Sequence, residues 1–331
     1  MKLTHAPFRC AAAGALAFLF CVPAANAMVA SVYDSKTDTA TALHNTSIPD
    51  GYSALNEIWN RTVYFGNATS GGTGTYLGRA KDGSHLVLTA KHVSFDKSNV
   101  SVSTTSGKNL QLIATKNWQI GTGDLQIHAV SADETTSAYL DELGNIEIYD
   151  KTPENTQPLF CVGTGKSSEI GSAFTSGTRE KQWAVFARDS ISDENGNVMP
   201  TIDVKESGVT TTCFVEILTK NGTSMQATQY DSGSGVFVWD SSENKWKIAG
   251  VTLAVGSNTD IDTSIIGYYE ESGKDSPKTC CTFFADLSQY APQINAIMAI
   301  PEPSAFSLLA GTCALVLAAS RRRRSRPLPL R

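Results

Sequence analysis

Three short stretches of the chain carry side chains that could act together in acyl transfer. His92 follows the apolar stretch 85–90, and Asp124 opens a second apolar stretch at 125–130. Ser232 stands in the sequence Ser-Gly-Ser-Gly, which runs directly into Val-Phe-Val-Trp. We expect a serine on such a tight turn, immediately before a buried strand, to expose its hydroxyl.

A serine hydroxyl is a weak nucleophile at neutral pH and needs an adjacent base to take its proton. An imidazole can be that base, because its unperturbed pKa of about 6.5 lets it accept a proton and later return it. His128 is the rival candidate, but it lies inside the stretch that Asp124 opens, where a base has little freedom. The sequence therefore favours His92 as the base and Ser232 as the nucleophile.

Short apolar runs separated by Gly, Asn, Ser and Asp make up most of the chain, and this pattern favours an all-β sandwich or barrel. The expected strands are 61–65, 75–78, 85–89, 110–115, 125–130, 159–163, 212–218, 235–238, 246–253 and 265–269. Helical periodicity is confined to 287–298, where Leu287, Tyr290, Ile294 and Ile297 fall on one face.

In the order His, Asp, Ser along the chain, these motifs resemble those of the trypsin-like serine proteases. The histidine motif is 88–92 (Leu-Thr-Ala-Lys-His), the aspartate motif 124–127, and the serine motif 231–235 (Asp-Ser-Gly-Ser-Gly). The stretch 248–251 is similar to the strand that lines the substrate cleft of the family, and 282–287 to its last strand.

The resemblance spans residues 63–298, and the protease domain is expected at 61–299. It implies an all-β fold with two six-stranded antiparallel β-barrels (chymotrypsin-like) and a C-terminal helix. The implied activity is that of a serine endopeptidase acting on protein or peptide substrates. No metal or cofactor is implied.

The resemblance also assigns roles to residues. His92 would be the general base, and Asp124 would hold its tautomer and stabilise the imidazolium. Ser232 would be the nucleophile, and the backbone N–H groups of Tyr230 and Ser232 would form the oxyanion hole. Asp231 carries over as the acid that pairs in this family with a freed N-terminal amine.

Three residues are expected to bind substrate. Gln226 would lie at the base of the specificity pocket, which argues against a preference for Lys or Arg because no carboxylate stands there. Thr252 and Leu253 would continue the cleft-lining strand.

The chain departs from the family pattern at Tyr230, where the family usually has glycine. A side chain there restricts the peptide orientation that an oxyanion hole requires. This departure motivates an alternative function, a catalytically impaired protease-fold surface binding protein. A structural β-protein of the matrix, in which the triad pattern is coincidental, is a third reading.

Residues 1–27 have a basic start, an apolar stretch and a closing Ala-Asn-Ala, the layout of a secretory signal peptide. An uncleaved N-terminal anchor is the alternative. Residues 28–60 are expected to be a polar leader.

Residues 300–326 combine Pro-Glu-Pro, an apolar segment at 304–320 and a run of arginines, and they resemble the PEP-CTERM sorting tail. That resemblance implies recognition by an exosortase-type enzyme and a transient membrane anchor. An ordinary C-terminal anchor is the alternative. Both patterns predict an exported protein at the cell surface or in the extracellular space, anchored by the C-terminal segment until it is processed.

The net charge of -5 argues against a nucleic-acid partner, which would require clustered Lys and Arg. Of seven cysteines, four lie outside the two terminal signals: Cys161, Cys213, Cys280 and Cys281. Export permits disulfides, and the four allow three pairings. Because Cys280 and Cys281 are adjacent, we expect at least one long-range bridge. No cysteine–histidine spacing indicates a zinc site.

Overall fold

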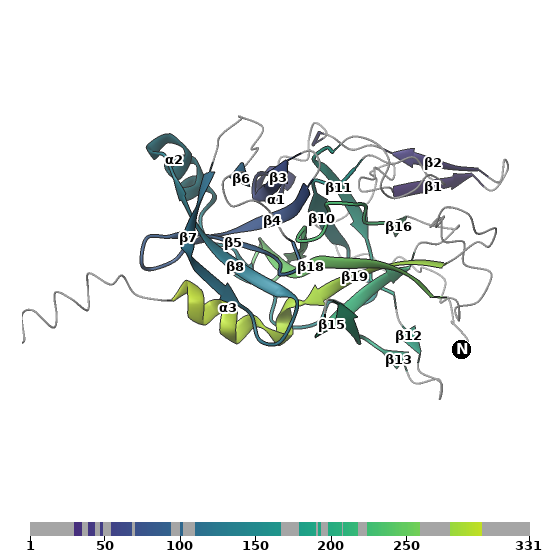
Figure 1. Ribbon diagram of the computed structural model, residues 1–331. Coiled ribbons are helices and arrows are strands. Elements are labelled where there is room, and N and C mark those ends of the chain that lie inside the picture. Colours follow the sequence, from purple (N-terminus) through teal and green to yellow (C-terminus); the bar gives the residue numbers. More distant parts are fainter. Residues whose placement is uncertain are drawn as a thin grey trace, which may run out of the picture.

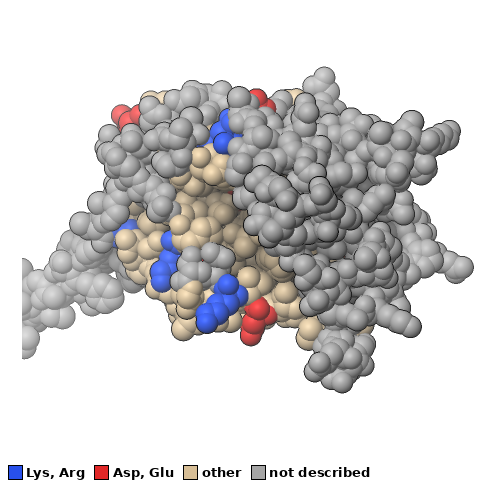
Figure 2. Space-filling view, turned by 45° about the vertical axis from the view of Figure 1, so that its right-hand side comes forward, with Lys and Arg blue, Asp and Glu red and all other residues tan. Residues whose placement is uncertain are grey.

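The computed structural model describes residues 30–34, 39–43, 47–48, 54–67, 70–93, 100–101, 110–166, 179–189, 191–192, 198–206, 208–217, 224–258 and 279–299. The expected signal peptide, the sorting tail with its apolar segment and the expected strand at 265–269 lie outside these ranges. Residues outside the described ranges are grey in Figure 2. Within them, no helix is both long and apolar enough to cross a membrane.

The first half of the fold is a six-stranded antiparallel sheet in the order β6-β3-β4-β5-β8-β7 (Figure 1). Its strands are β3 (Thr62–Asn67), β4 (Ser70–Arg79), β5 (His85–Ala90), β6 (Val100–Ser101), β7 (Leu110–Gln119) and β8 (Leu125–Ala132). The end strands β6 and β7 approach each other, so the sheet curls toward a barrel. Every residue of β5 is buried, as expected for a short apolar run covered on both faces.

The second half is an eight-stranded sheet in the order β11-β10-β17-β18-β19-β15-β14, with β9 added in parallel to β18. Its strands are β9 (Glu147–Ile148), β10 (Leu159–Gly163), β11 (Gln182–Phe186), β14 (Ile202–Glu206), β15 (Val209–Ile217), β17 (Gly235–Asp240), β18 (Lys245–Asn258) and β19 (Thr279–Asp286). The expected class, all-β with two antiparallel sheets and a C-terminal helix, is confirmed. The second sheet exceeds the expected six strands because β9 and the edge strand β14 join it.

In the part of the chain that the structure describes, four helical segments accompany the sheets: α1 (Leu55–Asn60), α2 (Glu134–Leu143), the 3-10 turn η1 (Leu287–Gln289) and α3 (Ala291–Met298). The helix expected at 287–298 therefore forms as η1 and α3, with Leu287 and Ile294 buried as expected. Helix α2 was not expected, because only Thr136 and Leu140 of its residues are buried and the apolar periodicity is weak. Its start is nevertheless capped, since the Asp133 side chain accepts from the Thr136 N–H at 2.7 Å.

The stretch 28–60, expected to be a polar leader, contains regular structure. Strands β1 (Ala30–Asp34) and β2 (Thr39–Leu43) form a small antiparallel sheet with β16 (Ser224–Met225), and β12 (Ile191–Ser192) pairs with β13 (Val198–Met199) elsewhere. Helix α1 buries Leu55, Ile58 and Trp59 in the core. Apolar burial of these three side chains joins α1 to the folded body.

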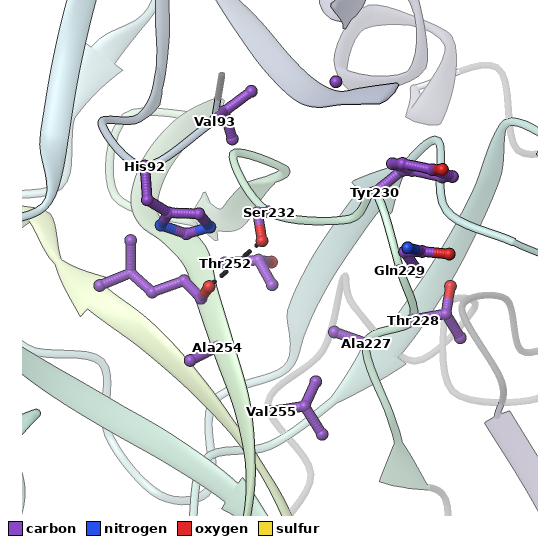
Figure 3. Close-up of a pocket in the computed structure, with 12 residues that line it drawn as sticks. His92, Val93, Ala227, Thr228, Gln229, Tyr230, Ser232, Thr252, Ala254 and Val255 are labelled. Carbon is purple, nitrogen blue, oxygen red and sulfur yellow. Dashed lines mark hydrogen bonds between the residues drawn. The ribbon is translucent and has the colours of Figure 1, made fainter. Parts of the chain in front are cut away.

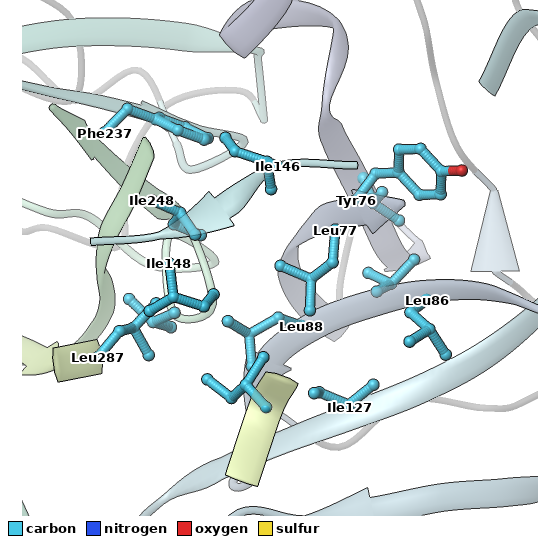
Figure 4. Packing of buried hydrophobic residues seen from close by; sticks show 14 of the residues in the cluster. Tyr76, Leu77, Leu86, Leu88, Ile127, Ile146, Ile148, Phe237, Ile248 and Leu287 are labelled. Atoms are coloured by element: carbon cyan, nitrogen blue, oxygen red, sulfur yellow. The ribbon is translucent and has the colours of Figure 1, made fainter. Parts of the chain in front are cut away.

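One hydrophobic core joins the two sheets. Leu88 and Ile127 of the first sheet belong to the same buried cluster as Phe237 and Ile248 of the second, and Ile146 of the connecting segment belongs to it too (Figure 4). Burial of this shared apolar surface stabilises the contact between the sheets, and the loops at their junction are held close together.

The expected long-range disulfide is not formed by Cys161, Cys213 or Cys281, which are free thiols in the structure. The three lie in three different hydrophobic clusters, so their sulfur atoms are kept apart by packing. The Cys161 Sγ instead contacts Thr252 Oγ1 at 3.6 Å, and the Cys213 Sγ donates to the Thr211 carbonyl at 3.4 Å. The side chain of Cys280 lies outside the description.

Candidate active site

The pairing of β5 with β8 brings His92 and Asp124 together. Ala90 lies opposite Leu125 in the register, so the residues just beyond the end of β5 face those just before β8. The His92 N–H donates to Asp124 Oδ1 at 2.8 Å, and His92 Nδ1 lies 2.5 Å from Asp124 Oδ2. The carboxylate thus holds both the backbone and the ring of His92, which leaves Nε2 for a second partner.

Asp124 is buried at the junction of the two sheets, with 1% of its surface exposed. Its carbonyl accepts from the Lys91 N–H at 3.1 Å, and its own N–H donates to Thr211 Oγ1 on β15 at 2.8 Å. The His92–Asp124 pair is therefore fixed from both sheets.

Ser232 lies on a tight turn that is held by strands on either side. The Thr73 N–H of β4 donates to the Ser232 carbonyl at 2.8 Å, and the Gly233 N–H donates to Thr252 of β18 at 2.8 Å. Gly233 has φ 92, and a Cβ there would meet the Thr73 carbonyl oxygen at 1.8 Å. Only glycine fits this close approach, which explains the Ser-Gly pair of the motif.

His92 and Ser232 line one hollow of about 340 Å³ (Figure 3). In this structure the Ser232 Oγ donates to the Leu253 carbonyl at 3.2 Å. Among the described residues it makes no hydrogen bond to His92, although Figure 3 shows the imidazole directly beside it. The Ser232 side chain must rotate about its Cα–Cβ bond for the hydroxyl to face the His92 ring.

The rest of the hollow is uncharged. The lining residues, apart from His92 and Ser232, are Gly71, Val93, Ala227, Thr228, Gln229, Tyr230, Thr252, Leu253, Ala254 and Val255. The expected substrate-binding residues Thr252 and Leu253 are among them. Gln226 is buried and is not among the described residues that line the hollow. The described walls suit an uncharged side chain.

The peptide between Gln229 and Tyr230 has a defined orientation. The Gln229 carbonyl accepts from the Lys166 N–H at 3.1 Å. In a trans peptide the N–H points away from the carbonyl, so the Tyr230 N–H faces the opposite side. Tyr230 has φ 82, the left-handed region that glycine adopts without strain. Within the described residues, neither the Tyr230 nor the Ser232 N–H donates a hydrogen bond.

Asp231, next to the serine, is fully buried and already satisfied. Its Oδ1 accepts from the Gly165 N–H at 2.7 Å, and its Oδ2 accepts from the Thr228 N–H at 2.8 Å and the Thr228 hydroxyl at 2.9 Å. Burial raises the pKa of Asp231 to about 6, while these hydrogen bonds and the charge of Arg179 act in the opposite direction. The family resemblance had suggested a freed N-terminal amine as its partner, whereas here Gly165 and Thr228 supply the donors.

Sequence reasoning missed several residues that shape the serine turn: Thr73, Thr164, Gly165 and Arg179. They are separated from Ser232 by tens of residues, and no local motif marks them. Among the described residues, no group of three or more His, Cys, Asp or Glu side chains could hold a metal ion.

No family model and no curated protein matches this chain. Several solved structures are similar in shape at low sequence identity. They include neuropsin from mouse brain (TM-score 0.44, 14% identity, covering 77% of this chain and 98% of that one). The serine endoprotease from Yersinia pestis (TM-score 0.41, 12% identity, 76% and 68%) and a Glu endopeptidase (TM-score 0.40, 14% identity, 72% and 90%) are also similar. At this level of likeness nothing about the activity of the chain follows from them.

Proposed function

We propose that the chain is a serine endopeptidase that cleaves peptide bonds through an acyl-enzyme intermediate on Ser232. The observation that carries the proposal is the His92–Asp124 pair, with Nδ1 and Oδ2 2.5 Å apart, beside a serine on the same hollow. A carboxylate that fixes one ring nitrogen leaves the other to act as a base, which is the arrangement that activates a serine hydroxyl.

In the proposed reaction, substrate displaces the Ser232 hydroxyl from the Leu253 carbonyl and the hydroxyl turns to His92. The imidazole takes the proton as Oγ attacks the peptide carbonyl carbon. The tetrahedral oxyanion accepts from the Tyr230 and Ser232 N–H groups. The imidazolium then protonates the leaving amine, and the C–N bond breaks.

Water completes the cycle. His92 accepts a proton from water as the water oxygen attacks the acyl carbon, and a second tetrahedral intermediate collapses to release the carboxylic acid. The proton held by His92 returns to the Ser232 oxygen. The Asp124 carboxylate keeps its charge throughout and stabilises the imidazolium at each step.

A second candidate function is that of a protease-fold binding protein with impaired turnover. The specific observation in its favour is the Ser232 hydroxyl, which donates to Leu253 at 3.2 Å rather than to His92. In such a protein the hollow would bind a peptide, and the serine would stay in this orientation.

The cellular setting is also a proposal, and it rests on the sequence patterns alone. We propose export through a signal peptide at 1–27 and sorting through the tail at 300–326, with its apolar segment at 304–320. An exosortase-type enzyme would recognise the tail. The protein would then act at the cell surface or in the extracellular space.

Labelling of the purified protein with a fluorophosphonate probe tests the proposed activity. We expect Ser232→Ala and His92→Ala each to lower the labelling rate by roughly 10³-fold or more, because the nucleophile or its base is gone. The matched control is Ser234→Ala, which removes a buried hydroxyl two residues along that has no hydrogen-bond partner among the described residues.

Ser234→Ala should label at the wild-type rate. A folded wild-type protein that does not label would contradict the proposed activity and favour the binding protein. Labelling that survives in Ser232→Ala would show that another nucleophile reacts.

A further inference from the structure

The Arg179 guanidinium lies over two tyrosine rings beside the serine turn. Its guanidinium carbon lies 5.0 Å from the centre of the Tyr64 ring and 5.1 Å from that of the Tyr230 ring. Both distances are within the range in which a cation is attracted to the face of an aromatic ring. The side chain of Tyr230, the residue that departs from the family pattern, therefore has a specific partner.

The guanidinium is also fixed in the plane of its N–H groups. Nε donates to the Thr164 carbonyl at 2.9 Å and Nη1 donates to the Phe65 carbonyl at 3.0 Å, while Nη2 donates to the Gly72 carbonyl. Phe65 and Gly72 belong to the first sheet, and Thr164 follows β10 of the second. The rigid fork of an arginine suits this set of acceptors, and the single ammonium of a lysine could not reach them all.

A chain of hydroxyl groups connects Arg179 to the backbone of Tyr230. Arg179 Nη2 donates to Thr164 Oγ1 at 2.9 Å, and Thr164 Oγ1 lies 2.7 Å from Thr73 Oγ1. The Thr73 hydroxyl donates to the Tyr230 carbonyl at 2.8 Å. Each hydroxyl can accept one hydrogen bond and donate one in the same direction, so the bonds of the chain strengthen one another.

The peptide on the other side of Tyr230 is held by the same segment. Lys166, whose N–H binds the Gln229 carbonyl, is paired with Arg179 in an antiparallel β-bridge. The carbonyls before and after the Tyr230 Cα are thus both fixed from the Arg179 side. The strained φ of 82 is maintained by these contacts and by the stack on the ring.

We propose that Arg179 is a positioning residue that orients the Tyr230 N–H for oxyanion binding, through the stack on its ring and the hydroxyl chain to its carbonyl. This inference rests on the proposed protease activity. It assigns the ordering of the serine turn to an internal arginine, whereas the family resemblance implied a freed N-terminal amine paired with Asp231. The Tyr230 side chain, through its contact with Arg179, accordingly helps to order the oxyanion hole.

The test measures the two constants of fluorophosphonate inactivation, the maximal rate constant kinact and the half-saturation concentration KI. The phosphonyl oxygen occupies the oxyanion position, so loss of a positioned N–H should slow bond formation. We expect Arg179→Met and Arg179→Lys to lower kinact by about tenfold or more, since a fully lost donor costs 10²–10³. KI should stay within about threefold, because Arg179 itself is not among the described residues that line the hollow.

Arg188→Met is the matched control. Arg188 is also half-buried and donates to backbone carbonyls, those of Pro153 and Asp189, but it does not line the hollow. It should leave kinact unchanged. If Arg179 had only a structural role, Arg179→Met and Arg179→Lys would lower the melting temperature but leave kinact of the folded fraction unchanged.

A second pair of variants keeps the arginine and changes the ring. Tyr230→Phe retains the stacking face and serves as the reference for the ring. Tyr230→Leu removes the face, and we expect its kinact to be about tenfold lower than that of Tyr230→Phe. In the Tyr230→Leu background, Arg179→Met should lower kinact by a smaller factor than it does in the wild-type protein, because the contact with the ring is already lost.

Wild-type kinact in both folded Arg179 variants would overturn the inference and leave the proposed activity standing. Equal kinact for Tyr230→Phe and Tyr230→Leu would show that the contact of Arg179 with the ring does not matter, and this would overturn the inference. A wild-type protein that does not react at all would overturn the proposed function, and the inference falls with it.

Discussion

At the scale of single residues, burial of the charged Lys181 side chain lowers the stability of the folded protein, and its surroundings only partly offset this loss. Its ammonium lies 4.5 Å from the centre of the Trp59 ring and has no hydrogen-bond partner among the described residues. Burial lowers the pKa of Lys181 from 10.5 to about 7. The folded protein therefore binds this proton less tightly than the unfolded chain does, and the lysine opposes folding wherever the unfolded chain is protonated.

The sign of the pH dependence follows from these two pKa values. The loss of stability is largest below pH 7, and it decreases as the pH rises from about 7 to about 10.5. We expect Lys181→Met to raise the free energy of unfolding at pH 6 by roughly 3 kcal/mol, the cost of the shift less the cation–π attraction. Urea unfolding of both proteins at pH 6 and 9.5 would measure this. A gain that is equal at the two pH values would contradict the assignment.

At the scale of elements, the turn between β16 and β17 depends on a glycine that no other residue can replace. Gly233→Ala would place a Cβ 1.8 Å from the Thr73 carbonyl oxygen and 2.2 Å from Thr89 Oγ1. We expect the variant to lose fluorophosphonate labelling, because either the turn or β4 must move and Ser232 moves with it. The free energy of unfolding should fall by more than the ~1–2 kcal/mol that a left-handed alanine costs.

Gly208→Ala is the control for backbone strain. Gly208 has φ 81, close to the φ of 92 at Gly233, yet a Cβ there would have no atom within 4 Å. This variant should lose only about 1–2 kcal/mol and should label at the wild-type rate. Equal losses of stability and labelling in the two variants would argue that close packing at the serine turn is unimportant.

At the scale of the whole molecule, helix α3 connects the end of the second sheet to the first. It follows β19 in the chain, and its Met298 carbonyl accepts from the Lys81 N–H, in the turn after β4, at 3.3 Å. Ile294 is fully buried in the cluster shared by both sheets. The two sheets should therefore unfold together rather than one after the other.

We expect Ile294→Ala to lower the free energy of unfolding by about 2–5 kcal/mol, the usual cost of truncating a buried isoleucine. Asn295→Ala, one residue along on the exposed side, should change it by no more than about 0.5 kcal/mol. Tryptophan fluorescence and far-UV circular dichroism should report one coincident transition in each protein. Separate transitions in Ile294→Ala would show that the sheets are independent units.

Most strands could be predicted because their signal is local. The apolar runs that became β5, β8, β10 and β17 bury nearly all their residues, and short apolar runs between turn residues predict strands. Strand β14 was not predicted, because it lies at the edge of the second sheet and three of the five residues in its sequence Ile-Asp-Val-Lys-Glu are charged. Cysteine pairing could not be predicted, since it depends on which cluster each sulfur enters.

By itself, the sequence determined the all-β class, the C-terminal helix and the three residues proposed for catalysis. Strand periodicity and the Ser-Gly-Ser-Gly turn are properties of neighbouring residues, and the order of the motifs can be read along the chain. Only the tertiary structure decided what surrounds Tyr230 and Asp231. Arg179, Thr164 and Thr73 reach the serine turn across two sheets, and contacts between residues far apart in the chain arise only when burial of the shared core brings the sheets together.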